Sequence, residues 1–256
     1  MSENIEQASE NSSVKRKRKR RLIVAIGLSI IERVERIIMH FSKVGDQPFL
    51  RADDFAWVRT LEENWEIIRV ELDHILEKPE NIPNFQDISK DQTNLTKDDL
   101  WKTFFLYGYG FKFEPNCDIC PQTTRVIESI PDMYTAMFSV LAPGKHIPPH
   151  RGPYRGLLRA HLALLVPEPN KECWIQVDEE TAHWQEGKCI VFDDTYQHQV
   201  ENNTDGTRVV LFLDILRPMR FPGSLLNKLI LYLIRWSPYI QDARRNQQAW
   251  EKRLGS

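Results

Sequence analysis

Residues 146–162 read His-Ile-Pro-Pro-His-Arg-Gly-Pro-Tyr-Arg-Gly-Leu-Leu-Arg-Ala-His-Leu, a composition unlike that of an ordinary protein core. The prolines and glycines predict a rigid turn that holds His150 in a loop. The residues after this turn alternate as a β-strand does, with Arg159 and His161 on one face and four apolar residues on the other: Leu158, Ala160, Leu162 and Leu164. One face can therefore fill a barrel wall while the other presents a cation and an imidazole to a cavity.

The second half of the chain consists of short apolar segments separated by Pro, Gly, Asn and Asp, which is typical of an all-β barrel or sandwich. The predicted strands are Tyr134–Leu141, Leu157–Val166, Cys173–Val177, Cys189–Phe192, Gln197–Glu201 and Thr207–Leu216. The segment Asn202–Gly206 predicts a hairpin turn. This turn would place His198 and Arg208 on adjacent antiparallel strands.

The first half of the chain favours helices and loops. From Pro48 to about Leu76 a turn and a helix are predicted, since apolar residues recur at helical spacing: Trp57, Leu61, Trp65, Ile68 and Leu72. Residues 77–100 are typical of a polar surface loop and residues 101–109 of an aromatic strand. Residues 122–130 predict a short helix that Pro131 ends.

The overall composition limits the classes of protein that fit. With 256 residues, 41% hydrophobic and 27% charged, the chain can build one substantial core with extensions. The net charge of −2 gives no signal for nucleic-acid binding. Four cysteines are too few for a disulfide framework in a chain of this length, so a reducing compartment is expected, with Cys117 and Cys120 as reduced thiols in a loop.

The N-terminal region has two parts. Residues 1–21 are polar, end in the seven consecutive cations of Lys15–Arg21, and are predicted to be a disordered basic tail. Residues 22–45 predict an amphipathic helix, because apolar residues recur at three- and four-residue steps: Ile23, Ile26, Ile30, Val34, Ile37 and Phe41. A membrane-spanning helix is disfavoured, because the apolar run meets Glu32 and Arg33 well before the roughly 20 residues that a span needs. No small-residue cleavage site follows the run, which argues against a signal peptide.

Two surfaces could receive this helix. A basic tail beside an amphipathic helix suits the anionic inner face of a membrane, whereas the alternative is docking on the body of the same protein. Residues 221–256 are predicted to form an apolar and a polar helix. The apolar stretch Leu225–Trp236 is too short to span and could pack on the body or lie on a membrane. The resulting hypothesis is a cytoplasmic protein bound peripherally to the inner face of the membrane.

Three histidines fall in the predicted β region: His150, His161 and His198. Two neutral imidazoles brought together across a barrel suit a borderline metal such as Fe(II), with positions left open for other molecules. Arg208, ten residues after His198, could hold a carboxylate through two parallel hydrogen bonds. His146 is excluded as a partner of His150, because the two prolines between them prevent the helix that their spacing would need.

Taken together, these residues resemble the aspartyl/asparaginyl β-hydroxylase family of Fe(II)- and 2-oxoglutarate-dependent dioxygenases. The resemblance rests on His150-x-Gly152, Arg159-x-His161, and Phe192-Asp-Asp followed by His198 and Arg208. Within the family the chain is most similar to the bacterial lipid A 2-hydroxylases, in Pro48-Phe-Leu, Glu63-Asn-Trp-Glu-Ile-Ile-Arg69, His150-Arg-x-Pro-Tyr154, Phe192-Asp-x-Thr-Tyr196 and Glu201-Asn-x-Thr204.

The resemblance covers about residues 47–220 and implies a mainly β fold. This fold is a double-stranded β-helix of the jelly-roll or cupin type with flanking α-helices, and its catalytic domain would occupy residues 46–220. The resemblance also implies His150 and His198 as the iron ligands, and four residues that bind 2-oxoglutarate: Ser139, Arg159, His161 and Arg208. The implied reaction converts 2-oxoglutarate and O₂ to succinate and CO₂ and inserts one oxygen atom into a substrate C–H bond.

Position 152 departs from the common triad of two histidines and one carboxylate. That triad would need Asp or Glu there, and the lipid A hydroxylases generally carry Asp. Gly152 is instead shared with the aspartyl/asparaginyl hydroxylases, in which water takes the place of the carboxylate. Asp193 and Asp194 are expected to shape the turn before His198 and to hydrogen-bond around the ligands.

Three functions fit these patterns. The first is hydroxylation of a lipid acyl chain at an anionic membrane surface, favoured by the overall resemblance and by the apolar helices at both ends. The second is β-hydroxylation of Asp or Asn in a peptide or small natural product, favoured by Gly152. The third is a non-catalytic barrel that serves as a membrane adaptor. No nucleic-acid partner is expected.

Overall fold

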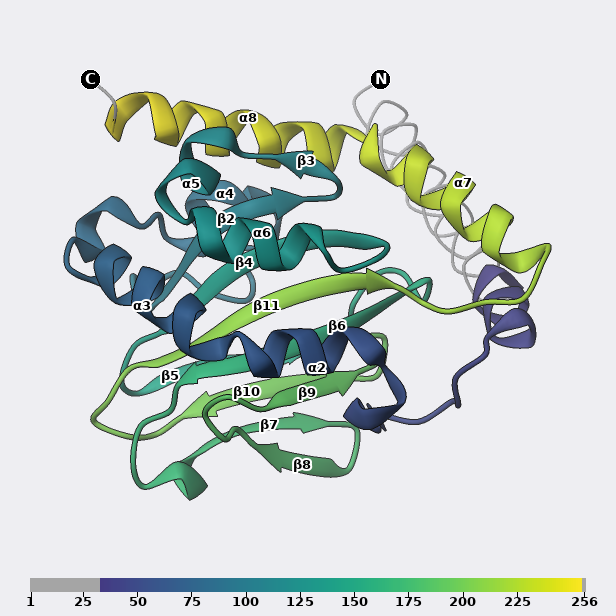
Figure 1. The fold of residues 1–256 in the computed structure, drawn as a ribbon, viewed down its shortest axis with the longest axis horizontal. Helices are drawn as coiled ribbons and strands as arrows, with labels where there is room; N and C mark the ends of the chain where they lie inside the picture. The colour runs from purple at the N-terminus through teal and green to yellow at the C-terminus, as the bar shows by residue number, and fades with distance from the viewer. Residues whose placement is uncertain (1–32, 255–256) are drawn as a thin grey trace, which may run out of the picture.

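The computed structural model describes residues 33–254 (Figure 1). Residues 33–41 are helical, so this helix ends before residue 45, the end expected from the sequence. The predictions for the basic tail at residues 1–21 and for the first part of the helix at 22–45 lie outside the described residues.

Two antiparallel sheets form the core of the molecule. The larger has the strand order β1-β9-β6-β11-β4-β2-β3 and the smaller the order β5-β10-β7-β8. The strands are β1 (Phe49–Leu50), β2 (Trp101–Gly108), β3 (Phe111–Lys112), β4 (Met133–Leu141), β5 (Lys145–His150), β6 (Leu157–Leu165), β7 (Cys173–Val177), β8 (Glu180–His183), β9 (Cys189–Phe192), β10 (His198–Asn202) and β11 (Arg208–Leu216). From β4 to β11 the chain passes repeatedly from one sheet to the other, which confirms the double-stranded β-helix of jelly-roll type.

Helices cover the outer face of the larger sheet. The helices α2 (Ala56–Glu63), α3 (Trp65–Leu76) and α6 (Pro121–Glu128) share one buried apolar cluster with side chains of β6 and β11 (Figure 1). The predicted helix that ends near Leu76 is in fact two helices, because the chain turns at Asn64, whose side-chain amide donates to the Thr60 carbonyl at 2.8 Å.

Shorter elements connect these layers. They are α4 (Phe85–Ile88), α5 (Glu114–Ile119) and the 3₁₀ turns η1 (Ala52–Asp54), η2 (Pro79–Asn81), η3 (Lys90–Gln92) and η4 (Asn170–Glu172). Cys117 lies in α5 rather than in a loop. All four cysteines are free and buried.

The alternation predicted for β6 is confirmed. Leu158, Ala160, Leu162 and Leu164 all belong to the apolar cluster under the helices. The intervening His161 instead contacts the rings of Phe192 and Phe212 in the barrel interior. The two faces of β6 therefore serve the core and the cavity separately, as a period of two requires.

The prediction of a loop at His150 is wrong, because the prolines lie in a strand. β5 is an edge strand of the smaller sheet, where a missing N–H is tolerated. His150 is opposite His198 and Ile147 is opposite Val200, so β5 has one residue more than β10 between these two pairs. This β-bulge accommodates Pro148 and Pro149 and ends the strand at His150. β8, which was also missed, has exposed polar residues on both faces and therefore no alternation to detect.

The prediction that His198 and Arg208 lie on adjacent strands is also wrong. β10 pairs with β5 and β7, whereas β11 pairs with β4 and β6 in the other sheet. The turn at residues 203–207 is thus a crossover between sheets and not a hairpin. The Asn202 side chain holds it, since its amide donates to the carbonyls of Leu141, Ala142 and Gly206 at 2.9–3.2 Å.

The C-terminal region forms the two predicted helices, α7 (Gly223–Arg235) and α8 (Pro238–Leu254), which run along one side of the barrel (Figure 1). Asn227 anchors α7, because it donates to the Gly156 carbonyl at 2.8 Å and accepts from the Tyr154 hydroxyl at 2.6 Å. None of the helices in the described part of the chain has both the length and the apolar content needed to cross a bilayer.

Candidate active site

His150 and His198 face each other across β5 and β10. They are direct partners in the strand ladder, and their ring centroids are 4.1 Å apart. Nδ1 of His150 lies 2.9 Å from the Pro148 carbonyl, and Nδ1 of His198 lies 3.0 Å from the Tyr196 carbonyl. A carbonyl can only accept, so each Nδ1 carries the proton and donates it. The lone pairs of both Nε2 atoms are then available to a metal ion.

Both imidazoles are held in the neutral form. Burial, together with the neighbouring His150 and Arg159, lowers the pKa of His198 to about 3. Burial also lowers the pKa of His150. Because only a neutral imidazole binds a metal ion, the pair is in the binding form at neutral pH.

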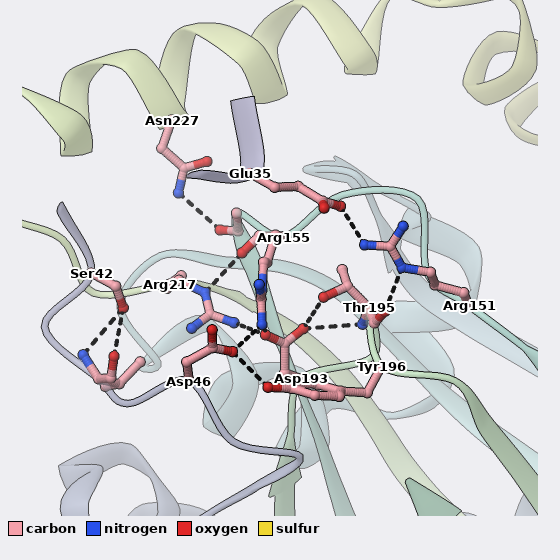
Figure 2. A network of polar contacts seen from close by, with 12 residues as sticks. Glu35, Ser42, Asp46, Arg151, Arg155, Asp193, Thr195, Tyr196, Arg217 and Asn227 are labelled. Atoms are coloured by element: carbon pink, nitrogen blue, oxygen red, sulfur yellow. Dashed lines mark hydrogen bonds and ion pairs between the residues drawn. The ribbon is translucent and has the colours of Figure 1, made fainter. Parts of the chain in front are cut away.

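A network centred on Asp193 positions the two segments that carry these histidines (Figure 2). The buried carboxylate of Asp193 accepts from Arg155 Nε at 3.1 Å and from the Arg217 guanidinium. It also accepts from the backbone N–H and the hydroxyl of Thr195, at 3.0 and 2.6 Å. Arg155 follows His150 and Thr195 precedes His198, so one carboxylate joins both segments.

The N-terminal segment extends this network (Figure 2). Glu35 accepts a hydrogen bond at 2.6 Å from Nη2 of Arg151, the residue that follows His150 in the chain. Asp46 accepts from the Tyr196 hydroxyl at 2.6 Å and pairs with Arg155. These contacts tie the start of the described chain to both histidine segments.

Gly152 is required by close packing. A Cβ atom at this position would lie 2.1 Å from Oδ2 of Asp194, and the Gly152 N–H donates to the Asp194 carbonyl at 2.7 Å. The Asp194 carboxylate thus occupies the space that a side chain at position 152 would need. Across residues 33–254, no group of three or more His, Cys, Asp or Glu is placed to hold one metal ion. The donor set fits a metal held by two histidines with its other positions open to small molecules.

Arg208 lies deep in the barrel and is 1% exposed. Its Nη1 donates to the Ser139 carbonyl at 3.2 Å, and its guanidinium lies 4.7 Å from the Trp184 ring centroid. Burial lowers the pKa of Arg208 to about 10, so the group remains charged. Among the described residues no carboxylate pairs with it, and its Nε has no hydrogen-bond partner. A buried cation without an anion is costly unless a ligand supplies one.

Ser139 and His161 lie close to this arginine. The Ser139 hydroxyl accepts from Trp101 Nε1 at 3.1 Å. His161 packs against Trp184 with a centroid separation of 6.1 Å, and neither of its ring nitrogens has a partner within the described part of the chain. Burial and the charge of Arg208 hold the pKa of His161 well below its usual value. Three of the four predicted cosubstrate residues therefore meet in the barrel interior, two of them with unsatisfied nitrogens.

Arg159 has a different environment. Its Nη2 is 2.9 Å from Asp194 and its Nε is 3.0 Å from Asp214, and its guanidinium lies over the Phe212 ring. Burial, with Asp214 and Asp193 nearby, raises the pKa of Asp194 to about 6 despite this arginine. Sequence reasoning missed Asp214, although a single acid in a strand whose other residues after Arg208 are all apolar is a usable signal.

A cavity of about 750 Å³ begins beside this site. Its polar end contains His150, Gly152, Arg159 and Asp194. Elsewhere it is bordered mainly by apolar side chains of the helix at 33–41, α4, β2, β4, α7 and α8, among them Val34, Ile88, Phe105, Met137, Ile230, Ile234 and Ile240. A volume of this size is typical of small-molecule sites.

Known proteins match the chain as follows. The family model for aspartyl/asparaginyl β-hydroxylase matches residues 62–218. An ornithine lipid ester-linked acyl 2-hydroxylase from Rhizobium tropici is 43% identical over 227 residues, which cover 89% of this chain and 81% of the relative. The human aspartyl/asparaginyl β-hydroxylase is 31% identical over 170 residues, which cover 64% of this chain but only 22% of that protein.

Similarity to solved structures is weaker. The cupin domain of Cnp3 from Schizosaccharomyces pombe aligns with 54% of this chain and 77% of its own, at 12% identity and a TM-score of 0.34. The assignment of the fold therefore rests on the strand order described above.

Proposed function

Because the chain belongs to the aspartyl/asparaginyl β-hydroxylase family, we propose that it is an Fe(II)- and 2-oxoglutarate-dependent hydroxylase of membrane-lipid acyl chains. In this proposal one oxygen atom of O₂ is inserted into a C–H bond of the chain. The protein would act in the cytoplasm, at the inner face of the membrane, where both 2-oxoglutarate and lipid are accessible.

The buried groups of the barrel support the two cofactor assignments. His150 and His198 present two neutral Nε2 atoms, which suit Fe(II). Arg208 would hold a carboxylate of 2-oxoglutarate, with the Ser139 hydroxyl and the His161 imidazole beside it. A non-catalytic adaptor would gain nothing from burying polar nitrogens without partners, since each such group destabilises the fold.

The apolar cavity is the observation that most favours a lipid acyl chain as the substrate. It leads from His150 to side chains such as Ile230 and Ile234, where a peptide backbone would find few hydrogen-bond partners. Each methylene group of an acyl chain buried there would contribute about 0.8 kcal/mol. The Rhizobium tropici relative, whose name states that it hydroxylates a lipid acyl chain, points the same way.

Hydroxylation of Asp or Asn is the second candidate, favoured by the human relative. An aspartate substrate would need a cation near the iron ligands. The arginines beside His150 are already paired, Arg151 with Glu35 at 2.6 Å and Arg159 with Asp194 and Asp214 at 2.9–3.0 Å. This pairing favours an uncharged acyl chain.

In this reaction, different residues of the chain would have different roles. Bound Fe(II) would supply the redox chemistry that couples O₂ to 2-oxoglutarate. Arg208 and Ser139 would orient the cosubstrate, while the Asp193 network keeps the two histidines in register. The apolar cavity would hold the acyl chain in place and exclude water from the reacting carbon.

Intact-lipid mass spectrometry tests the proposal. We expect a lipid species heavier by one oxygen atom in cells that express the protein, and its absence when His198→Ala is expressed instead. The purified protein should release succinate from 2-oxoglutarate only with Fe(II), O₂ and that lipid. A one-oxygen shift in a peptide, with none in any lipid, would instead establish the second candidate.

A further inference from the structure

One face of α7 exposes large apolar side chains to solvent. Leu225, Leu229 and Leu233 follow one another at four-residue spacing, and Tyr232 and Trp236 extend the same stripe. Phe221, just before the helix, is 80% exposed. These six residues are called the α7 face below.

α7 differs from an ordinary surface helix in which residues it buries. Asn227 is fully buried and hydrogen-bonded to Gly156 and Tyr154, whereas Leu225, Leu229 and Leu233 point outward. A Cβ at position 156 would lie 2.1 Å from Asn227 Oδ1, so the packing at this anchor is tight. The helix is therefore held with a stripe of apolar residues exposed, where a surface helix of a soluble protein places polar ones.

The charges along this segment are all positive. From Met219 to Gln241 the chain has Arg220, Lys228 and Arg235 and no acidic residue. Arg220 and Lys228 are exposed beside the α7 face, where Lys228 pairs with Asp132 at 3.1 Å. Phe221, Tyr232 and Trp236 supply the aromatic rings that favour the interface between lipid and water. Leucines and aromatic rings with flanking cations characterise helices that lie in the plane of a membrane.

The basic run of the N-terminus leads to the same region. The helix at 33–41 ends against the start of α7, where Phe41 leaves no room for a side chain at Gly223 and Ser42 pairs with Met219 (Figure 1). Lys15–Arg21 precede this helix by twelve residues in the sequence. Seven further cations therefore precede, in the sequence, a helix that packs on the start of α7, and basic residues near a membrane surface are attracted to anionic lipid.

We infer that the α7 face docks on the surface of an anionic lipid bilayer. The inference deepens the proposed function, because Ile230 and Ile234 of the same helix border the cavity. An acyl chain that leaves the bilayer along α7 would then reach the apolar side of the site. Docking itself requires neither iron nor turnover, so it can be tested independently of the reaction.

Vesicle flotation with the full-length protein tests the inference. The probe is a vesicle of phosphatidylethanolamine and phosphatidylglycerol, compared with one of phosphatidylcholine alone. The double variant Leu229→Gln, Leu233→Gln changes residues that are 55% and 62% exposed and do not border the cavity. We expect its partitioning onto the anionic vesicles to fall about tenfold or more, equivalent to about 1.4 kcal/mol.

A matched control separates this face from general surface hydrophobicity. Val70→Gln, Ile119→Gln changes residues that are 55% and 58% exposed on α3 and α5, and should bind vesicles as the wild type does. All variants should keep the wild-type melting temperature and the wild-type turnover of detergent-dispersed substrate.

Several outcomes would overturn the inference. They are equal binding of the wild type and the α7 double variant, an equal loss in the control variant, and no preference for anionic vesicles. A wild-type dimer that the α7 changes dissociate would assign the face to a second copy of the chain. Normal vesicle binding by a protein that hydroxylates no lipid would leave docking intact and refute the proposed function alone.

Discussion

The barrel interior and the α7 face depart from ordinary burial in opposite directions. Inside the barrel, Arg208 and His161 are buried with nitrogens that lack partners within residues 33–254. On α7, leucines and aromatic rings are exposed while Asn227 is buried. Each arrangement destabilises the isolated protein. Buried polar atoms lose their hydrogen bonds to water without replacing them, and exposed apolar side chains remain unfavourably hydrated.

The difference indicates which kind of ligand each region would bind. A small polar ligand, such as a cosubstrate with a carboxylate group, would accept hydrogen bonds from the buried nitrogens. Exposed leucines are satisfied by an apolar surface or chain. The cavity lies between the two regions without including the residues that define them. Arg159 and Asp194 border it at one end, and Ile230 and Ile234 of α7 border it at the other. The comparison can be tested by changing one region at a time.

The largest effect is expected from the histidine pair. His150→Ala or His198→Ala would remove one of the two proposed protein ligands, so turnover should fall by more than the roughly 100-fold that loss of an outer hydrogen-bond partner costs. Anaerobic titration with Fe(II), followed by an assay of succinate release, measures both steps. His146→Ala is the control, because His146 is exposed and paired with Glu201. Wild-type turnover in His198→Ala would refute the ligand assignment.

A smaller effect is expected at Arg208. Arg208→Ala should raise the KM for 2-oxoglutarate about 10- to 100-fold, since a hydrogen bond to a charged group contributes about 1.5–3 kcal/mol. Affinity for Fe(II) should be unchanged. Steady-state kinetics at varied 2-oxoglutarate measures the change, with a melting curve to exclude unfolding. An unchanged KM would show that the buried guanidinium has a structural role only.

Changes at two adjacent residues of α7 should have different effects on the KM for lipid. Ile234 borders the cavity and Leu233 points outward. Ile234→Gln should raise the KM for detergent-dispersed lipid about tenfold, because its amide would lie in an apolar space, whereas Leu233→Gln should not. Neither change should alter the KM for 2-oxoglutarate. Equal effects of the two variants would contradict the path assigned to the acyl chain.

The smallest effect concerns the metal-free protein and pH. An unfolded histidine binds a proton near pH 6.5, whereas folded His198, with its pKa of about 3, binds one only in strong acid. The unfolded state therefore binds more protons between these values, and stability should fall as the pH decreases from about 6.5 toward 3, by at most about 1.4 kcal/mol per pH unit for one group.

The raised pKa of Asp194 has the opposite effect, because it favours the folded state as the pH falls through mildly acidic values. The contribution of His198 is therefore measured by comparing the wild type with a His198 variant. Urea midpoints of metal-free wild type and His198→Gln at pH 7 and pH 5 measure it. The variant should lose less stability than the wild type on acidification. Identical losses would show that His198 is not held neutral by the fold.

The two strands that carry the site show how far sequence patterns reach. β6 was predicted correctly, because Leu158 to Leu164 alternate with a period of two that is visible locally. The loop predicted at β5 is wrong, since Pro148 and Pro149 fit in a strand only at a sheet edge with a bulge. Whether a segment lies at a sheet edge depends on distant pairing, which local composition does not encode.

The sequence by itself determined the family, the barrel class and the candidate residues His150, His198 and Arg208, because spacing and residue type are local properties of the chain. Tertiary structure alone decided that His198 pairs with His150 rather than lying on a hairpin with Arg208. It also decided that Asp194 fills the space at Gly152, and that α7 buries Asn227 and exposes Leu225, Leu229 and Leu233. These facts depend on strand register and helix rotation, which contacts between residues far apart in the chain determine.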